Sequence, residues 1–164
     1  MQTGKSVFNW TGKGGMEQCD WLRPGRVKAP AVLVVEDDED IAELLRYSLA
    51  KKGVTVVLAH DGMAGFDLAE EVRPCLILLD IMLPNLNGHE VCSLIRAHPD
   101  RKLAQTPIIM LSALTDHDDI ARGMFLGADG YFTKPYEVKE VVREALKFLC
   151  PDRREAGEGA EGFW

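Results

Sequence analysis

The sequence predicts an α/β protein built on a doubly wound, five-stranded parallel sheet. Two observations lead to this prediction. Between residues 31 and 150, short apolar runs alternate with segments in which apolar residues recur every three or four positions. The runs themselves show no polar alternation, which is typical of strands buried on both faces of a parallel sheet. Right-handed crossovers then place helices on both faces.

The first half of this pattern contains three strands and three helices. The run AVLVV, from residue 31, is the first expected strand, and the helix after it places Leu45 and Leu49 on one apolar face. The second strand is expected in VTVVLA, followed by a helix over about residues 62–71. The third is CLILLD, followed by a helix near residues 89–97. Each strand is therefore followed by a helix.

The second half repeats this order twice. The strand PIIMLS is followed by a helix near residues 116–125, and the short strand GYFT by a final helix. In the final helix, apolar residues from Val138 to Leu149 recur at three and four positions and form one stripe. Five strand and helix pairs therefore account for the whole segment.

The segment is expected to be one domain, over residues 30–150. A leader over residues 1–29 and a tail over residues 151–164 are rich in glycine and charge and lack apolar periodicity, which favours flexible segments. No second domain is expected after the last helix.

The overall composition indicates a globular protein, with 46% apolar and 27% charged residues. No apolar run approaches the roughly 20 residues that cross a membrane, and the first residues lack the apolar stretch of a secretion signal. We therefore expect a cytoplasmic protein that makes no membrane contact.

Charge and cysteine content exclude two further classes. Residues 31–150 carry twelve basic and twenty acidic side chains, so the domain has no basic footprint for direct nucleic-acid binding. The four cysteines form no CxxC pair and are expected to be reduced and structural. The pair His89-Glu90 resembles half of a zinc-protease motif, but Ser93 occupies the position of its second histidine, which argues against zinc.

Polar residues follow four of the five predicted strands. Glu36 and Asp37 follow the first strand, Asp80 ends the third, Ser112 ends the fourth and Lys134 follows the fifth. The carboxyl ends of parallel strands meet at one edge of the sheet, where ligands bind in open α/β folds. These side chains are therefore expected to converge.

The convergence of carboxylates implies a cation. Two like charges about 4 Å apart cost roughly 4 kcal/mol at an effective dielectric of 20, and a divalent ion relieves this cost. Ligands that are all oxygens suit Mg²⁺ or Mn²⁺. Helix capping explains Asp38, Glu39 and Asp40 without a metal but not Asp80. Lys134, taken alone, is more typical of a surface lysine paired with an acid, and only its position after the fifth strand favours a role at the site.

Four motifs, VLVVEDDED, LLDIMLPNLNG, IIMLSA and GYFTKPY, together resemble the receiver domain of bacterial two-component response regulators. The resemblance covers about 120 of the 164 residues. It implies a flavodoxin-like fold with strand order 2-1-3-4-5. Glu36 stands where aspartate is common in the family and Ser112 where threonine is common, and both keep the functional atoms.

The resemblance assigns roles to individual residues. It makes Asp80 the phosphoacceptor and Glu36 and Asp37 the acidic pair around Mg²⁺, with the backbone carbonyl of Met82 as a further ligand. The resemblance also implies that Ser112 and Lys134 contact the phosphoryl group, that Ala113 leaves space beside it, that Tyr131 is an aromatic switch, and that the Lys134-Pro135 peptide bond is cis.

The implied function is that of a signalling switch rather than an enzyme. A sensor histidine kinase or a histidine phosphotransfer protein would donate the phosphoryl group, and altered contacts with a downstream protein would be the output. The surface formed by the helix near residues 116–125, the strand GYFT and the final helix would carry this output or a homodimer. Tyr131 could instead be a half-buried strand aromatic with no switching role.

We expect a stand-alone receiver similar to the chemotaxis regulators, but alternatives remain open, among them a receiver-like binding module that never takes phosphate. The chain could be the receiver piece of a larger regulator or hybrid kinase, or a phosphorelay intermediate. An aspartyl-phosphate phosphatase would also use an aspartate after a parallel strand, but such enzymes place an acid-base aspartate where this sequence has Met82.

Overall fold

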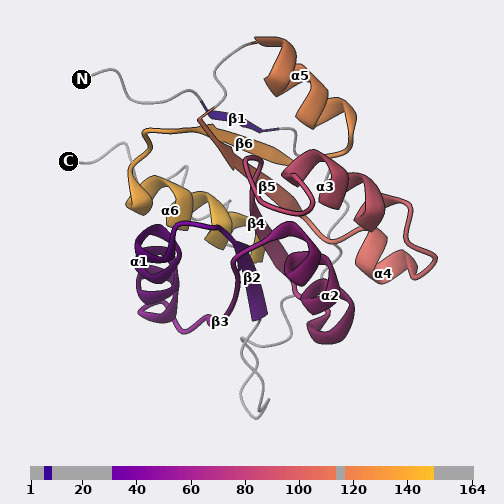
Figure 1. The fold of residues 1–164 in the computed structure, drawn as a ribbon. Coiled ribbons are helices and arrows are strands. Elements are labelled where there is room, and N and C mark those ends of the chain that lie inside the picture. The colour runs from indigo at the N-terminus through magenta and orange to yellow at the C-terminus, as the bar shows by residue number, and fades with distance from the viewer. Residues whose placement is uncertain (1–5, 9–30, 114–116, 150–164) are drawn as a thin grey trace.

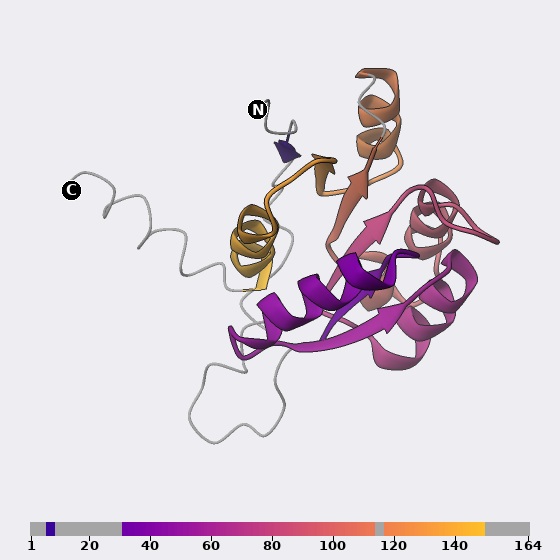
Figure 2. The ribbon, with the colours of Figure 1, turned by 60° about the vertical axis from the view of Figure 1, so that its left-hand side comes forward.

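A computed structural model describes residues 6–8, 31–113 and 117–149 of the chain. The described part of the chain forms a twisted sheet with helices on both faces (Figures 1 and 2). The predicted α/β fold with a flavodoxin-like, mostly parallel sheet is confirmed. The leader outside residues 6–8, the tail, Cys19 and Cys150 lie outside the described residues.

Five parallel strands form the body of the sheet. They are β2 (Ala31–Val35), β3 (Thr55–Ala59), β4 (Leu76–Asp80), β5 (Ile108–Ser112) and β6 (Gly130–Thr133), and their spatial order is β3-β2-β4-β5-β6. This is the order 2-1-3-4-5 that the family resemblance implies. All residues of β4 and β5 are buried, because helices cover both faces of these central strands.

The sheet has one strand more than the sequence analysis expected. Residues Ser6–Phe8 form β1, which pairs antiparallel with β6 at the edge of the sheet, with Val7 opposite Tyr131. The prediction of five strands is therefore corrected to six, and part of the expected leader belongs to the sheet. Three residues are too few to show a periodic pattern, and an edge strand needs no second apolar face.

The helices divide between the two faces of the sheet. On one face, α1 (Glu39–Ala50) and α6 (Val138–Leu149) pack on each other and on apolar residues of the strands, including Val34 and Leu78. On the other face lie α2 (Gly62–Val72), α3 (Gly88–Arg96) and α5 (His117–Phe125), whose apolar residues meet Leu33 and Leu79. Alternate strand residues thus supply two separate cores.

Helix boundaries follow local capping signals. The side chains of Asp38, Asp61 and Asn87 each accept hydrogen bonds from the first-turn backbone of α1, α2 and α3. A single turn, α4 (Arg101–Ala104), lies between α3 and β5 and was not expected from the sequence, since four residues show no helical period. Along the described residues, no helix combines the length and the apolar character that a membrane crossing requires.

Candidate functional site at the carboxyl edge of the sheet

The polar residues that follow the strands meet at one edge of the sheet. Asp80 is the last residue of β4, and β4 lies between β2, which Glu36 follows, and β5, which Ser112 ends. Lys134 follows β6, the next strand along, and its backbone N–H donates to the carbonyl of Ser112. Parallel pairing therefore brings together groups that are as far apart in sequence as Glu36 and Lys134.

Three carboxylates form a compact cluster at this edge. One oxygen from each of Glu36, Asp37 and Asp80 can be chosen so that all lie within 4.8 Å of one another. Glu36 is fully buried and Asp80 is 2% exposed, whereas Asp37 is exposed to solvent. Three oxygen ligands with one side open to water suit a hard divalent ion such as Mg²⁺, which keeps part of its water shell. The donor set of this cluster therefore fits the predicted ion.

Lys134 lies between two of these carboxylates. Its Nζ donates to Glu36 Oε2 at 3.0 Å and to Asp80 Oδ2 at 3.2 Å. Its side chain is about three-quarters buried, so the ammonium is held at the site and does not extend into solvent. The peptide bond between Lys134 and Pro135 is cis, the isomer that the family resemblance implies. The alternative interpretation of Lys134 as a surface lysine is therefore wrong.

The cluster is electrostatically unbalanced. Burial, together with the nearby charge of Asp80, raises the pKa of Glu36 to about 7, and the contact with Lys134 only partly opposes this rise. Burial lowers the pKa of Lys134, but the charges of Asp80 and Glu36 outweigh it, so the net pKa is raised and the ammonium remains charged. One ammonium thus faces three carboxylates, and an additional cation would stabilise their ionised forms.

The acidic run after β2 divides into two functions. The Asp38 side chain accepts hydrogen bonds from the backbone N–H groups of Asp40 and Ile41 at 3.0 and 3.1 Å, and Glu39 and Asp40 form the first turn of α1. The capping interpretation of these three residues is confirmed. Glu36 instead points into the site, and its backbone carbonyl contacts His60 Nδ1 at 3.0 Å.

The loop after Asp80 is packed closely against the acceptor. The Met82 backbone N–H donates to Asp80 Oδ1 at 3.2 Å, which orients the carboxylate. Gly88 begins α3 at a position where a Cβ atom would collide with the Asp80 carbonyl oxygen, so only glycine permits this approach. Asn87 and Glu90 complete a capping box at the same helix start. The assignment of the Met82 carbonyl as a metal ligand stays a prediction.

Ser112 connects the acceptor edge to Tyr131. Both residues are fully buried, and a hydrogen bond joins the Ser112 side chain to the Tyr131 hydroxyl. Burial raises the pKa of this hydroxyl, and the bond to Ser112 partly opposes the rise. Tyr131 is therefore not a half-buried strand aromatic, and its ring lies inside the fold. Ala113, the next residue after Ser112, is exposed, and its role of leaving space for the phosphoryl group stays a prediction.

Two residues near the site were not assigned to it from the sequence. A pocket of about 560 Å³ next to the acidic cluster is lined by Asp37 and Met82 and also by His89 and Arg122. His89 is the second residue of α3 and Arg122 lies on α5, so only the packing of these helices brings the two together. In the sequence, His89 stands out only as half of a zinc-protease motif, and no sequence feature indicates a role for Arg122.

Comparison with known proteins gives consistent results. A family model described as the response regulator receiver domain matches residues 32–146. The DNA-binding response regulator MtrA of Mycobacterium tuberculosis is 40% identical over 130 residues, which are 79% of this chain and 54% of MtrA. The chain thus spans about half the length of the curated relatives it matches.

Solved structures show the same similarity. The receiver domain of a Francisella response regulator has 28% identity and a TM-score of 0.68, and the match covers 75% of this chain and 98% of that one. The receiver domain of a signal transduction histidine kinase from Syntrophus aciditrophicus has 29% identity and a TM-score of 0.69, covering 77% and 94%. Such domains thus resemble this chain whether they come from regulators or from kinases.

Proposed function

Because the chain belongs to the response regulator receiver family, we propose that Asp80 accepts a phosphoryl group from a phosphohistidine in a reaction that depends on Mg²⁺. The donor would be a sensor histidine kinase or a histidine phosphotransfer protein. The phosphorylated protein would then signal through altered contacts with other proteins. In this proposal the chain is a switch and catalyses only its own phosphorylation and dephosphorylation.

One observation carries the proposal. Asp80 ends a fully buried strand, yet its carboxylate lies within 4.8 Å of two other carboxylate ligand atoms and 3.2 Å from a buried ammonium. A structural role for Asp80 would be served by one cation and would not need Glu36 and Asp37 beside it. The excess of negative charge instead suits a divalent ion and, with that ion, an incoming phosphoryl group.

Each residue of the site would have a separate role in the phosphoryl transfer. Glu36, Asp37 and Asp80 would hold Mg²⁺, and the ion would supply positive charge at the phosphoryl oxygens. Lys134 supplies a second positive charge, and the Ser112 hydroxyl can donate to a phosphoryl oxygen. The Met82 N–H keeps one carboxylate oxygen of Asp80 oriented.

The chemical step is a substitution at phosphorus. A carboxylate oxygen of Asp80 forms the new bond to phosphorus while the phosphorus–nitrogen bond of the donor breaks. The electron pair of that bond goes to the ring nitrogen, and the donor ring, which carries a proton on its other nitrogen, leaves as neutral histidine. The product is an acyl phosphate on Asp80. No general base is needed, because the attacking group is a carboxylate, which has no proton to lose.

The hydrogen bond between Ser112 and Tyr131 supports a route from the acceptor to the surface. Tyr131 is in β6, which lies between α5 and α6, and Phe125 at the end of α5 is 90% exposed. A phosphoryl group that draws in the Ser112 hydroxyl would change this bond and bias both groups together. A preference of about 1.4 kcal/mol shifts a two-state ratio tenfold.

Two of the alternatives keep the phosphorylation of Asp80 but place the receiver in a larger regulator, a hybrid kinase or a phosphorelay. MtrA is a DNA-binding response regulator and is longer than the matched segment, so this receiver could regulate a nucleic-acid-binding partner or module without contacting nucleic acid itself. The similarity to a kinase receiver supports, in the same way, a place in a hybrid kinase or a phosphorelay. The phosphatase alternative has less support, because position 82 presents an exposed methionine in place of an acid.

The proposal is tested with a small phosphodonor. The full chain is incubated with acetyl phosphate and Mg²⁺, and intact-mass analysis counts added phosphoryl groups. One group is expected with Mg²⁺ and none with EDTA or in Asp80→Asn. A group that still appears on Asp80→Asn, with the same Mg²⁺ dependence, would show that the acceptor is another residue.

The output surface is tested separately by amide hydrogen exchange with and without beryllofluoride, a mimic of the phosphoryl group. Changes in protection are expected from Ala113 to Lys139, across α5, β6 and the start of α6. If protection changes only around Asp80, this face does not carry the output.

A further inference from the structure

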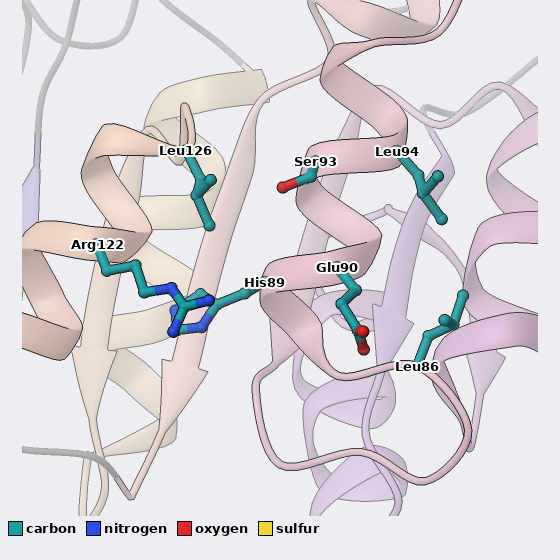
Figure 3. Close-up of a pocket in the computed structure, with 7 residues that line it drawn as sticks. All are labelled: Leu86, His89, Glu90, Ser93, Leu94, Arg122 and Leu126. Carbon is teal, nitrogen blue, oxygen red and sulfur yellow. The ribbon is translucent and has the colours of Figure 1, made fainter.

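A second pocket lies on the surface between α3 and α5, away from the acidic cluster (Figure 3). Its volume is about 350 Å³, which is within the range of sites for small ligands. Leu86, Leu94 and Leu126 supply apolar walls. The polar lining consists of His89, Glu90, Ser93 and Arg122. A mostly apolar wall with a few convergent polar groups is the usual composition of a small-molecule site.

His89 lacks the hydrogen bond that its burial requires. The side chain is 7% exposed, and its Nε2 atom is buried without a partner in the described part of the chain. A buried polar group left without a partner costs about 1–3 kcal/mol. Burial, and then the charge of Arg122, lower the pKa of His89, while Asp119 opposes this effect. Burial therefore favours the neutral imidazole, and its Nε2 has no hydrogen-bond partner among the described residues.

Arg122 lacks a carboxylate partner. Within residues 6–8, 31–113 and 117–149, no acidic side chain lies within ion-pair distance of its guanidinium. Figure 3 shows the Arg122 side chain extending from α5 toward His89, and the Glu90 carboxylate directed away from it. Glu90 is already occupied, since it accepts a hydrogen bond from the Asn87 N–H at 2.9 Å.

We propose that the pocket between α3 and α5 binds a small organic carboxylate, with its anionic group on Arg122 and His89 and a short apolar chain against Leu94 and Leu126. A guanidinium pairs with a carboxylate through two parallel hydrogen bonds. Glu90 and Asp119 lie nearby, so a singly charged anion is favoured over a doubly charged phosphate. Rotation of the exposed Arg122 side chain gives the ligand access to Nε2.

The position of this site also links it to the acceptor edge. His89 and Arg122 line the larger pocket that reaches Asp37 and Met82 as well as the smaller one. A carboxylate on Arg122 would therefore lie against the loop that follows Asp80. Ligand binding at this site would not require phosphorylation of Asp80, and a bound metabolite would act on the loop that follows Asp80.

The test uses hexanoate as the probe, with the full chain and without Mg²⁺. Binding is followed by NMR chemical-shift changes at His89 and Leu126. Saturable shifts at both residues are expected. The uncharged analogue 1-hexanol and inorganic phosphate should each bind at least about tenfold more weakly, because 1-hexanol lacks the anionic group and phosphate lacks the apolar chain. Equal binding of 1-hexanol, or shifts confined to other regions, would overturn the proposal.

Variants separate the site from general surface charge. Arg122→Gln should weaken hexanoate binding at least about tenfold, and Leu94→Ser should weaken it severalfold, without loss of the folded circular dichroism spectrum. Arg143→Gln, at an exposed arginine on α6, is the matched control and should bind as the wild type does. Unchanged binding in Arg122→Gln, or an equal loss in Arg143→Gln, would refute the assignment.

The outcome is independent of the proposed phosphorylation. Asp80→Asn should bind hexanoate as the wild type does, since Asp80 does not line this pocket. Failure of hexanoate binding with intact phosphorylation would reject the carboxylate site alone.

Discussion

The two ends of the sheet each hold a network of charged side chains, and the networks differ in their charge balance. At the amino ends of β5 and β6, Arg96 donates to Asp129 Oδ2 at 2.9 Å and to the carbonyls of Ala104, Thr106 and Gly127. Asp129 also accepts from the Ile108 N–H at 3.0 Å. One cation and one anion thus satisfy each other and the surrounding backbone. This network fastens α3 to the sheet.

The carboxyl end is organised differently. Among the described residues, Lys134 is the one cation that contacts the cluster of Glu36, Asp37 and Asp80, through Glu36 and Asp80. The first network is complete without a ligand, whereas the second needs a further cation for the ionised carboxylates to coexist. The comparison shows that burial of charge does not by itself mark a functional site. A functional site is indicated instead by buried charges that the surrounding side chains do not compensate.

The sharpest test of this difference removes one carboxylate at each end. Asp80→Asn should abolish phosphorylation by acetyl phosphate, and Asp129→Asn should leave it at the wild-type level, as measured by intact mass. The effect on stability should be opposite. Without metal, Asp80→Asn should unfold at equal or higher denaturant, because it removes a like charge beside Glu36, and Asp129→Asn at lower denaturant. Equal loss of phosphorylation in both variants would erase the distinction.

The second test removes the cation at each end. Arg96→Ala should lower the free energy of unfolding by about 3 kcal/mol, with or without Mg²⁺, because it removes the ion-pair partner of Asp129 and the side-chain donor to three carbonyls. Lys134→Ala should also lower it in EDTA, but Mg²⁺ should raise the free energy of unfolding of this variant as much as that of the wild type, because its Mg²⁺ affinity is nearly unchanged. Urea unfolding in both conditions measures this. A Lys134→Ala protein that Mg²⁺ does not stabilise would contradict the proposed metal site.

The third test uses pH. The pKa of Glu36 is about 7 in the folded protein and 4.5 in its ordinary state, so the folded form binds this proton more tightly. The resulting stabilisation is fully present below pH 4.5 and is lost as pH rises through 7. The metal-free wild type should therefore lose on the order of 2 kcal/mol of unfolding free energy over this window.

Variants identify the group responsible for this pH dependence. Glu36→Gln should show a flatter profile between pH 4.5 and 7, because it removes the titrating carboxyl group. Glu43→Gln, at an exposed glutamate of α1, should keep the wild-type slope. Urea midpoints measured across the window supply the comparison, and identical slopes in Glu36→Gln and the wild type would exclude Glu36.

The fourth and smallest effect separates the roles within the acidic end. Asp37→Ala should weaken Mg²⁺ binding at least about tenfold, or 1.4 kcal/mol, because it removes one of three oxygen ligands. Lys134→Ala should leave Mg²⁺ affinity nearly unchanged and weaken the response to phosphorylation. Calorimetric titration of both variants tests this. Equal loss of affinity would remove the difference between ligand and phosphoryl-contact roles.

The parts of the molecule that depend on local chemistry were predictable. The apolar runs that became β4 and β5, and the stripe along α6, depend on residues a few positions apart. The same holds for Asp38 as a helix cap. The placement of Asp80 and Lys134 at one edge of the sheet could also be predicted from the sequence, because strand direction in a parallel sheet determines which edge they share.

Short or contact-dependent features were not predictable. β1 and α4 contain three and four residues, too few for a period, and β1 exists through its pairing with β6. The sequence expected Lys134 near Asp80 but did not show that it also contacts Glu36. Nothing local distinguishes Arg96, which donates four hydrogen bonds to residues eight or more positions away, from Arg122, which has no acidic partner in the described part of the chain.

The sequence by itself therefore determined the fold class, the strand ends that carry polar groups and the identity of the acidic cluster, because each depends on short-range patterns. Tertiary structure alone decided which charges are compensated. Asp129 and Asp80 are both aspartates at a strand end, yet one meets a single arginine and the other meets two more carboxylates. Charge balance is a property of distances in space, and these are set only when α3, α5 and the strands pack together.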